Sequence, residues 1–487
     1  MHPACGVPGC APSHVLPGPR TPAAEGPQKS KELKKCGGRR VATAERGLMN
    51  TNPQTTRLLG YIRLQPGIKP IPGYTVLFAC LTGIPFLVII NFIQPYILTA
   101  MLDIPTRQHG SLSGYLAILH EIIMVLLTSP IGALADRVGR RRILGSGYII
   151  AAAGLMIYPW ATSVIGLMLI RCIYAVGAAA IVSSYSILLA DYPQEKSRGK
   201  LIAMAGVLNG LGILIITFIG GNLPAWLVSM DFGPITAGRM AMGLIGIACI
   251  ISGIIVFVGL RGGDRGIASG AEKQAFRSLL RQGFGAARNP RIAVSYASAF
   301  AGRGDVVVIG TYVSLWGTQA GIARGMTEAD ALAKATIVFA VLQTASLLAA
   351  PLIGVLNDRI NRVTALVFGM TLAAIGYIAF GLQTDPFSGN WLPIAIVLGI
   401  GQISAVLAGT TLIGQEADPK ITGVTIGVWS FCGALGTMAG SLVGGLIYDM
   451  FSPGAPFLMM GIANLIVALA TYYVRIKYPQ HKALDLA

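Results

Sequence analysis

The chain has 487 residues, enough for two or three soluble domains, but only 12% of them are charged while 54% are apolar. Soluble domains carry about 25% charged residues, and the mean hydropathy here is +0.67. So few charges cannot coat several globules in water, which excludes an ordinary soluble enzyme and a disordered protein and indicates a lipid bilayer as the solvent. The net charge is +17. The basic residues lie in short links between apolar runs, so nucleic acid is not expected as a partner.

Residues 1–72 are rich in Pro, Gly, Lys and Arg and contain no apolar run long enough for a signal peptide. This composition predicts a disordered, basic N-terminal tail. Met49 offers a second start, so residues 1–48 are either not translated or a genuine part of the tail. If translation begins at Met49, a chain shortened to that start should insert and function normally.

Twelve apolar runs follow the tail. A bilayer core about 30 Å thick needs about 20 apolar residues in a helix, and runs of that order cover 74–98, 111–135, 143–160, 164–190, 201–223, 239–260, 292–316, 335–356, 364–382, 391–414, 422–447 and 456–474. They predict an all-α polytopic membrane protein with twelve transmembrane helices. The long link splits the spans six and six, giving a first half 73–260, a linker 261–291 with a short surface helix over 271–284, a second half 292–475 and a tail 476–487.

The distribution of Lys and Arg predicts the orientation. If the N-terminus is cytoplasmic, 31 of the 37 basic residues lie in cytoplasmic segments and 4 in links on the other side. An excess of basic residues marks the cytoplasmic side of membrane proteins, so we expect an integral protein of the plasma (inner) membrane with both termini in the cytoplasm. The sequence contains no nucleophile-and-base pair, metal-ligand spacing or nucleotide-binding glycine loop. We therefore expect no enzyme activity, no catalytic residue, no cofactor, no metal and no ATP drive, and we expect a monomer.

The two halves contain copies of one motif. Gly132-Ala-Leu-Ala-Asp136-Arg137-Val-Gly139-Arg140 and Gly354-Val-Leu-Asn-Asp358-Arg359-Ile-Asn361-Arg362 share Gly, Leu, Asp, Arg and the final Arg at an offset of 222 residues. A weaker copy pairs three glycines of span five with three of span eleven at an offset of 224: Gly212, Gly220 and Gly221 with Gly436, Gly444 and Gly445. Because each half has six spans and the same starting side, the repeat is predicted to be parallel.

The segment Gly132-Ala-Leu-Ala-Asp136-Arg137-Val-Gly139-Arg140-Arg141-Arg142 resembles the loop 2–3 signature of the major facilitator superfamily, and the likeness extends from about residue 70 to the end. The resemblance implies two six-helix halves and solute transport by alternating access. It also implies that Asp136 clamps the halves on the cytoplasmic side while the site faces outward, with Gly132, Arg137, Gly139, Arg140 and Arg141 forming the rest of this gating motif and Gly354, Asp358, Arg359 and Arg362 its second copy. The alternative is that the basic residues only anchor the turn at the membrane surface.

Spans four and five carry further parts of the resemblance. Arg171-Cys-Ile-Tyr174-Ala175-Val-Gly177 is similar to the family's Arg-x-x-Gln-Gly-x-Gly pattern, from which Tyr174 and Ala175 depart. At 1.5 Å per residue Arg171 lies about 10 Å deep, where it either faces a cavity or extends back to the surface. In span five, Ile216 and Thr217 replace the Gly-Pro of the family's drug antiporters, which weakens a drug-antiport assignment.

Four ionisable residues lie near the middle of spans: His120 and Glu121 in span two, and Arg303 and Asp305 in span seven. Charges in hydrocarbon cost several kcal/mol and seldom occur without partners. Residues two apart do not face each other on a helix, so we expect one of Arg303 and Asp305 to reach the cavity and the other a neighbouring helix. The alternative roles are a structural salt bridge and, for His120 and Glu121, a static hydrogen-bonded pair.

The family resemblance implies that spans one, four, seven and ten line the cavity. The candidate lining residues are Asn91, Gln94, Tyr185, Tyr312, Trp316 and Gln402. We expect a secondary active transporter of a small organic solute, with an anionic or zwitterionic solute favoured. The transport is expected to be coupled to protons through Asp305 first and Glu121 second. Proton-driven efflux of amphipathic compounds or drugs, and a non-transporting receptor on the same fold, are the alternatives.

Overall fold

The computed structural model describes residues 57–261, 276–387, 389–418 and 421–478, and of residues 276–280 it describes only the backbone. Most of the predicted N-terminal tail, residues 1–56, lies outside this part of the chain, as do 479–487. From Thr55 onward the chain forms one unit. It contains twelve helices long and apolar enough to cross a membrane, which confirms the twelve-span prediction.

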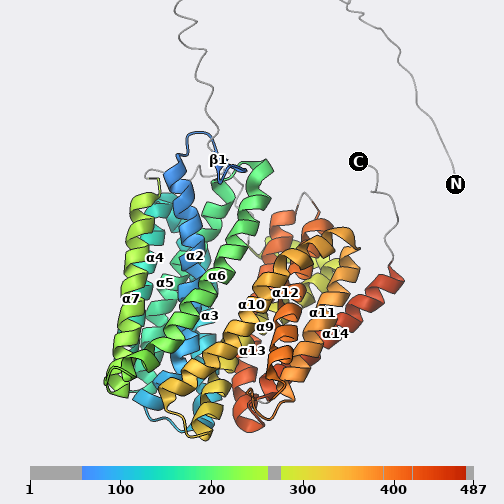
Figure 1. Cartoon of the computed structure of the whole chain (residues 1–487). Helices are drawn as coiled ribbons and strands as arrows, with labels where there is room; N and C mark the ends of the chain where they lie inside the picture. The colour runs from blue at the N-terminus through green and yellow to red at the C-terminus, as the bar shows by residue number, and fades with distance from the viewer. Residues whose placement is uncertain (1–56, 262–275, 388, 419–420, 479–487) are drawn as a thin grey trace, which may run out of the picture. The chain divides into compact units, whose positions relative to one another are not determined.

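The helices gather in two bundles of six (Figure 1). The first half consists of α2 Pro70–Tyr96, α3 His109–Val138, α4 Arg140–Ile157, α5 Val164–Asp191, α6 Glu195–Val228 and α7 Pro234–Gly259. The second consists of α9 Pro290–Ala323, α10 Glu328–Arg359, α11 Arg362–Gly381, α12 Trp391–Glu416, α13 Thr422–Met450 and α14 Ala455–Lys477. We call the membrane side on which α2 begins and α14 ends the terminal face, and the other side the opposite face.

Helix ends follow local chemistry. Proline occupies the first turn of α2, α7 and α9, where a missing N–H costs nothing. Side-chain oxygens cap other starts: Ser163 accepts from Gly166 N at 3.1 Å, and Thr327 accepts from Asp330 N at 3.2 Å. Several helices extend beyond the predicted apolar runs because such caps and prolines lie in the polar flanks, outside the hydrophobic signal.

Glycines at the helix crossings repeat between the halves. A Cβ on Gly147 would meet Ala180 at 2.9 Å, and one on Gly154 would meet Tyr174 at 2.7 Å, so α4 and α5 pack backbone to backbone. Gly369 and Gly376, 222 residues further on, face Ser404 and Leu398 of α12 at 2.8 and 2.6 Å. Small residues allow membrane helices to approach this closely. The parallel repeat predicted from the loop motif is therefore built into the packing.

The residues directly before α2 differ from the predicted disordered tail. Arg57–Leu58 and Ile62–Arg63 form a two-stranded antiparallel hairpin, β1 and β2. Leu58, Ile62 and Leu64 are at most 1% exposed. Backbone bonds tie this segment to the α5–α6 turn: Gln65 N donates to Tyr192 O, and Gln194 N donates to Arg63 O, both at 2.9 Å. Alternate apolar residues in a short run gave a strand signal that the basic composition masked.

The linker contains a helix, α8 Phe276–Gly285, close to the surface helix predicted over 271–284. Residues 271–275 lie outside the described residues. Gly283 packs against α13, since its Cβ would meet Val424 at 3.1 Å, and Tyr296 of α9 donates a hydrogen bond to Gly283 O at 2.9 Å. The end of the linker is therefore fixed to the second half.

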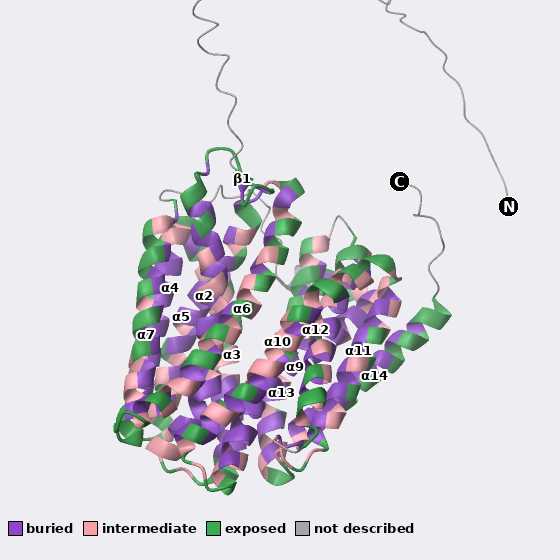
Figure 2. Ribbon diagram, viewed as in Figure 1, coloured by how far each residue is buried: buried purple, intermediate pink, exposed green. Residues whose placement is uncertain are grey.

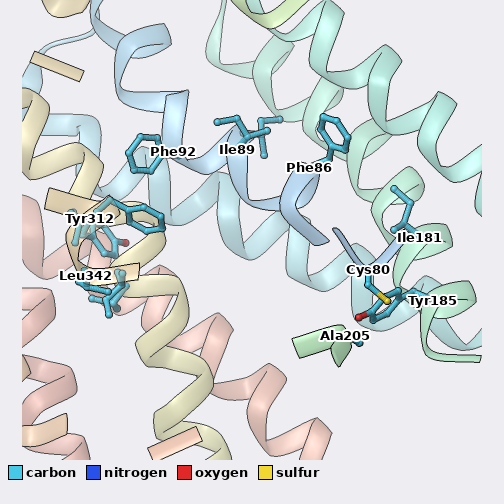
Figure 3. Packing of buried hydrophobic residues seen from close by; sticks show 14 of the residues in the cluster. Cys80, Phe86, Ile89, Phe92, Ile181, Tyr185, Ala205, Tyr312 and Leu342 are labelled. Atoms are coloured by element: carbon cyan, nitrogen blue, oxygen red, sulfur yellow. The ribbon is translucent and has the colours of Figure 1, made fainter. Parts of the chain in front are cut away.

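The buried residues face the interior of each bundle while the outward surfaces are exposed and apolar (Figure 2). This is the pattern expected of helices surrounded by lipid. Figure 3 shows part of the buried cluster, with Phe86, Ile89 and Phe92 following one another along α2. The ring of Phe92 lies 5.0 Å from that of Phe339 of α10, between centroids, so the core continues from one half into the other.

We expect Gly436→Ala to destabilise the protein. A Cβ on Gly436 of α13 would fall far inside van der Waals contact with Phe300 O of α9. Over-packing of this kind costs about 1–3 kcal/mol. Thermal unfolding in detergent should show a melting temperature several degrees below that of the parent. Gly427→Ala is the matched control on the same helix because nothing lies within 4 Å of its Cβ position. Equal melting temperatures for the two variants would contradict the close packing of α13 against α9 at Gly436.

Candidate functional site

Arg171 of α5 is the centre of a buried polar cluster in the first half. Its side chain is 0% exposed, and Nη2 donates a hydrogen bond to Asn91 Oδ1 of α2. The guanidinium lies over the ring of Tyr174, with Cζ 5.8 Å from the centroid. The ring of His120 of α3 lies 5.6 Å from the same ring, between centroids. Arg171 thus points into the bundle and not towards the membrane surface.

Neutral hydrogen bonds hold the helices around this cluster. Gln94 of α2 donates to Ser113 Oγ of α3 at 2.7 Å and accepts from Tyr158 Oη at 3.3 Å. Tyr174 donates to the backbone oxygen of Phe86 at 2.7 Å. These bonds fix α2, α3 and α5 relative to one another, so the predicted residues Asn91, Gln94, His120 and Arg171 come together in one place.

Glu121 and Arg303 are mid-span charges that belong to different halves. Glu121 is half-buried on α3 and Arg303 is exposed near the middle of α9. Among the described residues the two form no ion pair. A Cβ on Gly433 of α13 would meet Arg303 Cγ at 2.7 Å, so the arginine leans towards α13. An exposed charge at mid-span needs water or a counter-charge beside it. Each half therefore contributes one charge at mid-span that is not fully buried.

Asp305 points the other way, into the second half. Its carboxylate, 0% exposed, accepts from Asn464 Nδ2 of α14 at 2.8 and 3.0 Å. Tyr377 of α11 donates to its backbone oxygen at 2.9 Å. Arg303 and Asp305 do not pair with each other, as their spacing of two residues predicted.

The Gly132–Arg141 motif forms the turn from α3 to α4 at the terminal face. Gly139 has φ 105° and ψ 132°, a conformation that requires glycine. Arg140 forms an ion pair with Asp136 at 3.5 Å and a second with Asp191 at the end of α5. Arg141 stacks on Phe257 of α7, 4.5 Å from Cζ to the ring centroid. Among the described residues, Asp136 forms its ion pair with Arg140 of its own half and none with α13 in this conformation.

The second copy makes its turn differently. Where the first has Gly139, the second has Asn361, whose Oδ1 accepts from Val363 N at 2.9 Å and caps α11. Arg362 donates to Thr411 O of α12 at 3.2 Å. A Cβ at Gly354, as at Gly132, would meet nothing within 4 Å. Asn361 and Arg362 thus bond to residues of the second half, while Asp358 and Arg359 are exposed.

The halves meet on the opposite face, at a carboxylate that the sequence analysis missed. Asp449 at the end of α13 accepts hydrogen bonds from Gly110 N at 2.9 Å and Ser111 N at 2.6 Å, at the first turn of α3. A carboxylate at a helix N-terminus is stabilised by the helix dipole and by charge-assisted bonds. Gly445-x-x-x-Asp449 has the same Gly-x₃-Asp spacing as Gly132–Asp136, a signal that could have found it.

Other bonds reinforce this contact. Tyr448 of α13 donates to Gln319 Oε1 of α9 at 2.7 Å, and Gln319 Nε2 donates to Thr106 O of the first half at 3.3 Å. A Cβ on Gly445 would clash with Gly110, and one on Gly221 of α6 would clash with Thr336 of α10. The α3–α13 and α6–α10 crossings therefore join the halves near the opposite face.

Four predicted lining residues have mainly packing contacts. Trp316 packs on Phe380 with ring centroids 5.4 Å apart, and Tyr312 stacks on Tyr448 at 5.6 Å while donating to Ser441 O at 2.7 Å. Tyr185 accepts from Asn209 Nδ2 at 2.9 Å and lies beside Cys80 (Figure 3). Gln402 lies 3.5 Å from Ser346 Oγ. The sequence also missed Asn464, Tyr158 and Asp191, since a single amide, hydroxyl or end-of-span carboxylate carries no pattern.

Twelve spanning helices in two parallel-repeat halves, with charges between them at mid-span, define an integral membrane protein of the transporter type. The model of the Major Facilitator Superfamily matches residues 76–342 and 326–486. The chain belongs to this superfamily, as the loop motif indicated, and is a membrane transporter of that kind.

Individual relatives are more distant. The chain is 26% identical to the magnetosome protein MamH of Paramagnetospirillum magneticum over 79% of this chain and 88% of MamH. It is 29% identical to the magnetosome protein MamZ of Magnetospirillum gryphiswaldense over 77% of this chain but 58% of MamZ. The crystal structure of a D323A mutant of the nucleoside transporter NupG is similar with a TM-score of 0.65 at 13% identity, covering 83% of this chain and 99% of NupG. This structural likeness shows the fold.

Asp136→Asn should reduce transport sharply without unfolding the protein. Asp136 is half-exposed and its ion pair with Arg140 spans 3.5 Å, so its loss should cost at most about 1 kcal/mol of stability. The charge would matter in the conformation that brings this turn to α13. Initial transport rates and melting temperature should be compared with those of Asp358→Asn, for which we expect a smaller loss. Equal transport by Asp136→Asn and the parent would contradict the hypothesis that Asp136 clamps the halves.

Proposed function

We propose that the chain is a secondary active transporter that moves a small organic solute by alternating access, coupled to protons. The observation that carries this is the asymmetry of the contacts between the halves. Asp449 and the glycine crossings join the halves on the opposite face, while at mid-span Glu121 is half-buried and Arg303 is exposed. This asymmetry supports a conformation in which the solute site opens to the terminal face.

Two clamps would alternate. Asp449 closes the opposite face here, and Asp136, whose described ion pair lies within its own half, would close the terminal face after the halves rock. We assign the terminal face to the cytoplasm, because 31 of 37 basic residues belong to segments on that side. Both termini are then cytoplasmic, and the protein acts as a monomer without catalysing a reaction.

The proton would be carried by a carboxylate whose partner changes as the halves move. Glu121 suits this role because Arg303, a mid-span cation whose charge can act on it, belongs to the other half. Asp305, which the sequence ranked first, is bound by Asn464 and Tyr377 of its own half. We therefore place Glu121 first and Asp305 second. Loss of a nearby cation raises the proton affinity of a carboxylate, which would link proton uptake to the rocking motion.

The membrane is proposed to be the plasma membrane. The similarity to MamH and MamZ over more than three quarters of this chain favours a second location, the magnetosome membrane, in a cell that has one. Membrane fractionation followed by antibody detection distinguishes the two.

Two other functions are separated by one assay. Proteoliposomes that accumulate a labelled small solute support the proposal, whereas accumulation of lipophilic cationic dyes alone would favour efflux of amphipathic compounds. Absence of movement for every solute that stabilises the purified protein would favour a receptor.

Glu121→Gln should abolish accumulation driven by an imposed pH gradient while some exchange down a solute gradient continues. The amide keeps the shape of the side chain and removes the proton site. Glu195→Gln is the control, because Glu195 is an exposed carboxylate paired with Arg198 at 2.9 Å on the terminal face. Loss of this accumulation in Asp305→Asn but not in Glu121→Gln would make Asp305 the first candidate for the proton carrier. Accumulation that ignores the pH gradient would remove proton coupling.

Asp449→Asn should shift the protein away from the conformation described here. Loss of the charge weakens two bonds across the halves, worth about 1–3 kcal/mol, so the populations should change roughly tenfold. Spin labels at Leu134→Cys and Ile426→Cys, in a chain without other cysteines, would report a shorter distance at the terminal face. Asp231→Asn, an exposed loop carboxylate on the opposite face, is the control. Unchanged distance distributions would contradict the Asp449 clamp.

A further inference from the structure

The buried cluster around Arg171 contains hydrogen-bond donors without acceptors. Arg171 has five N–H groups, of which the described structure uses one nitrogen, Nη2, in the bond to Asn91. Its Nε and Nη1, like Nδ1 of His120, have no partner. The nearby hydroxyls donate their protons elsewhere, Tyr174 to Phe86 O and Tyr158 to Gln94 Oε1. The oxygen of Tyr158 also interacts with Arg171, but a neutral hydroxyl supplies no negative charge.

The charge of Arg171 is also uncompensated. Among the described residues, no carboxylate forms an ion pair with it. Glu121 follows His120 in the sequence but forms no ion pair with Arg171. Burying a cation without a counter-ion costs several kcal/mol, and such residues inside membrane proteins usually mark a substrate or ion pathway. The cost is recovered if the missing anion is a ligand.

We propose that Arg171 and His120 bind an oxyanion group, a carboxylate or a phosphate, of the transported solute. The guanidinium supplies the charge and N–H donors, His120 supplies one further N–H, and Tyr174 holds the guanidinium through its ring. Asn91 fixes Nη2, so the plane of Arg171 is preorganised. This inference rests on the proposed transport function and narrows its solute to anions.

The route to Arg171 runs past His120. Arg171 is 0% exposed, whereas His120 is half-buried beside Glu121 at the space between the halves. The oxyanion would reach Arg171 after His120 rotates, with the rest of the solute left towards Glu121 and Arg303. A solute with one anionic end and a polar or basic body suits this arrangement.

The test is anion-dependent thermal stability of the purified full chain in detergent, at constant ionic strength in chloride. The probes are inorganic phosphate and succinate, with succinamide as the uncharged match of succinate. Ligand that binds only the folded state raises the melting temperature, so phosphate or succinate should raise it by several degrees and succinamide should not. No rise with either anion would overturn the proposal.

Arg171→Gln separates a ligand site from a structural role. It removes an uncompensated buried charge, so without anion this variant should melt at or above the temperature of the parent, and it should lose the anion-dependent rise. Arg239→Gln is the matched control, an arginine stacked on Trp160 at 4.1 Å on the opposite face, and should keep the rise. An anion-dependent rise retained in Arg171→Gln would overturn the proposal.

If Arg171→Gln does not fold, Arg171→Lys and His120→Gln take its place. We expect each of them to need at least a tenfold higher anion concentration for the same rise in melting temperature. An unchanged anion dependence in both variants would overturn the site.

Failure of the anion site and failure of the transport function give different results. Anion binding with no solute movement in proteoliposomes would leave the site and remove the transport function. Transport of uncharged solutes without anion binding would leave the transport function and remove the anion site.

Discussion

Two helix crossings, α3 with α13 and α6 with α10, hold the halves together, and each requires a glycine at the contact. Gly445 meets Gly110, and Gly221 meets Thr336, at distances that leave no room for a side chain. In a bilayer no hydrophobic force drives helices together, so close packing and hydrogen bonds must do so. The bonds of Asp449 to the first turn of α3 are possible only because the backbones lie this close. Closure of the opposite face thus depends on the glycines at these crossings as much as on the charge of Asp449.

The same geometry decides which charges can take part in transport. Groups bonded within one half, such as Asp305 with Asn464, keep their partners when the halves move as rigid bodies. Charges that belong to different halves and are not fully buried, such as Glu121 and Arg303, change their surroundings when the halves move. Arg171 belongs to neither class, because it has no counter-charge in its own half among the described residues. A mobile anion would complete its site in one conformation and leave it in another, which is what transport of that anion requires.

The fold could be predicted almost entirely from the sequence, since hydrophobic run length fixes the number of spans and the Gly132–Arg140 repeat fixes their symmetry. The hairpin Arg57–Arg63 was missed because two-residue strands have too little periodicity to outweigh a basic composition. For the site, helical rise gives the depth of a residue but not the direction of its side chain. Arg303 and Asp305 could be separated by their spacing, yet only the structure shows that Asn464 is the partner of Asp305 and that Trp316 packs on Phe380.

The two Gly-x₃-Asp segments impose a further condition on the energetics. A transporter works only if both conformations are populated, which limits their difference to a few kcal/mol. Asp449 makes two backbone bonds in the conformation described here, while Asp136 keeps an ion pair at 3.5 Å with Arg140. Rocking would break the first set and free Asp136 to form an equivalent one with α13. Because each proposed clamp is a carboxylate near a helix terminus, four residues after a glycine, the gain on one face could match the loss on the other, and a solute or proton bound between the halves would then tip the balance.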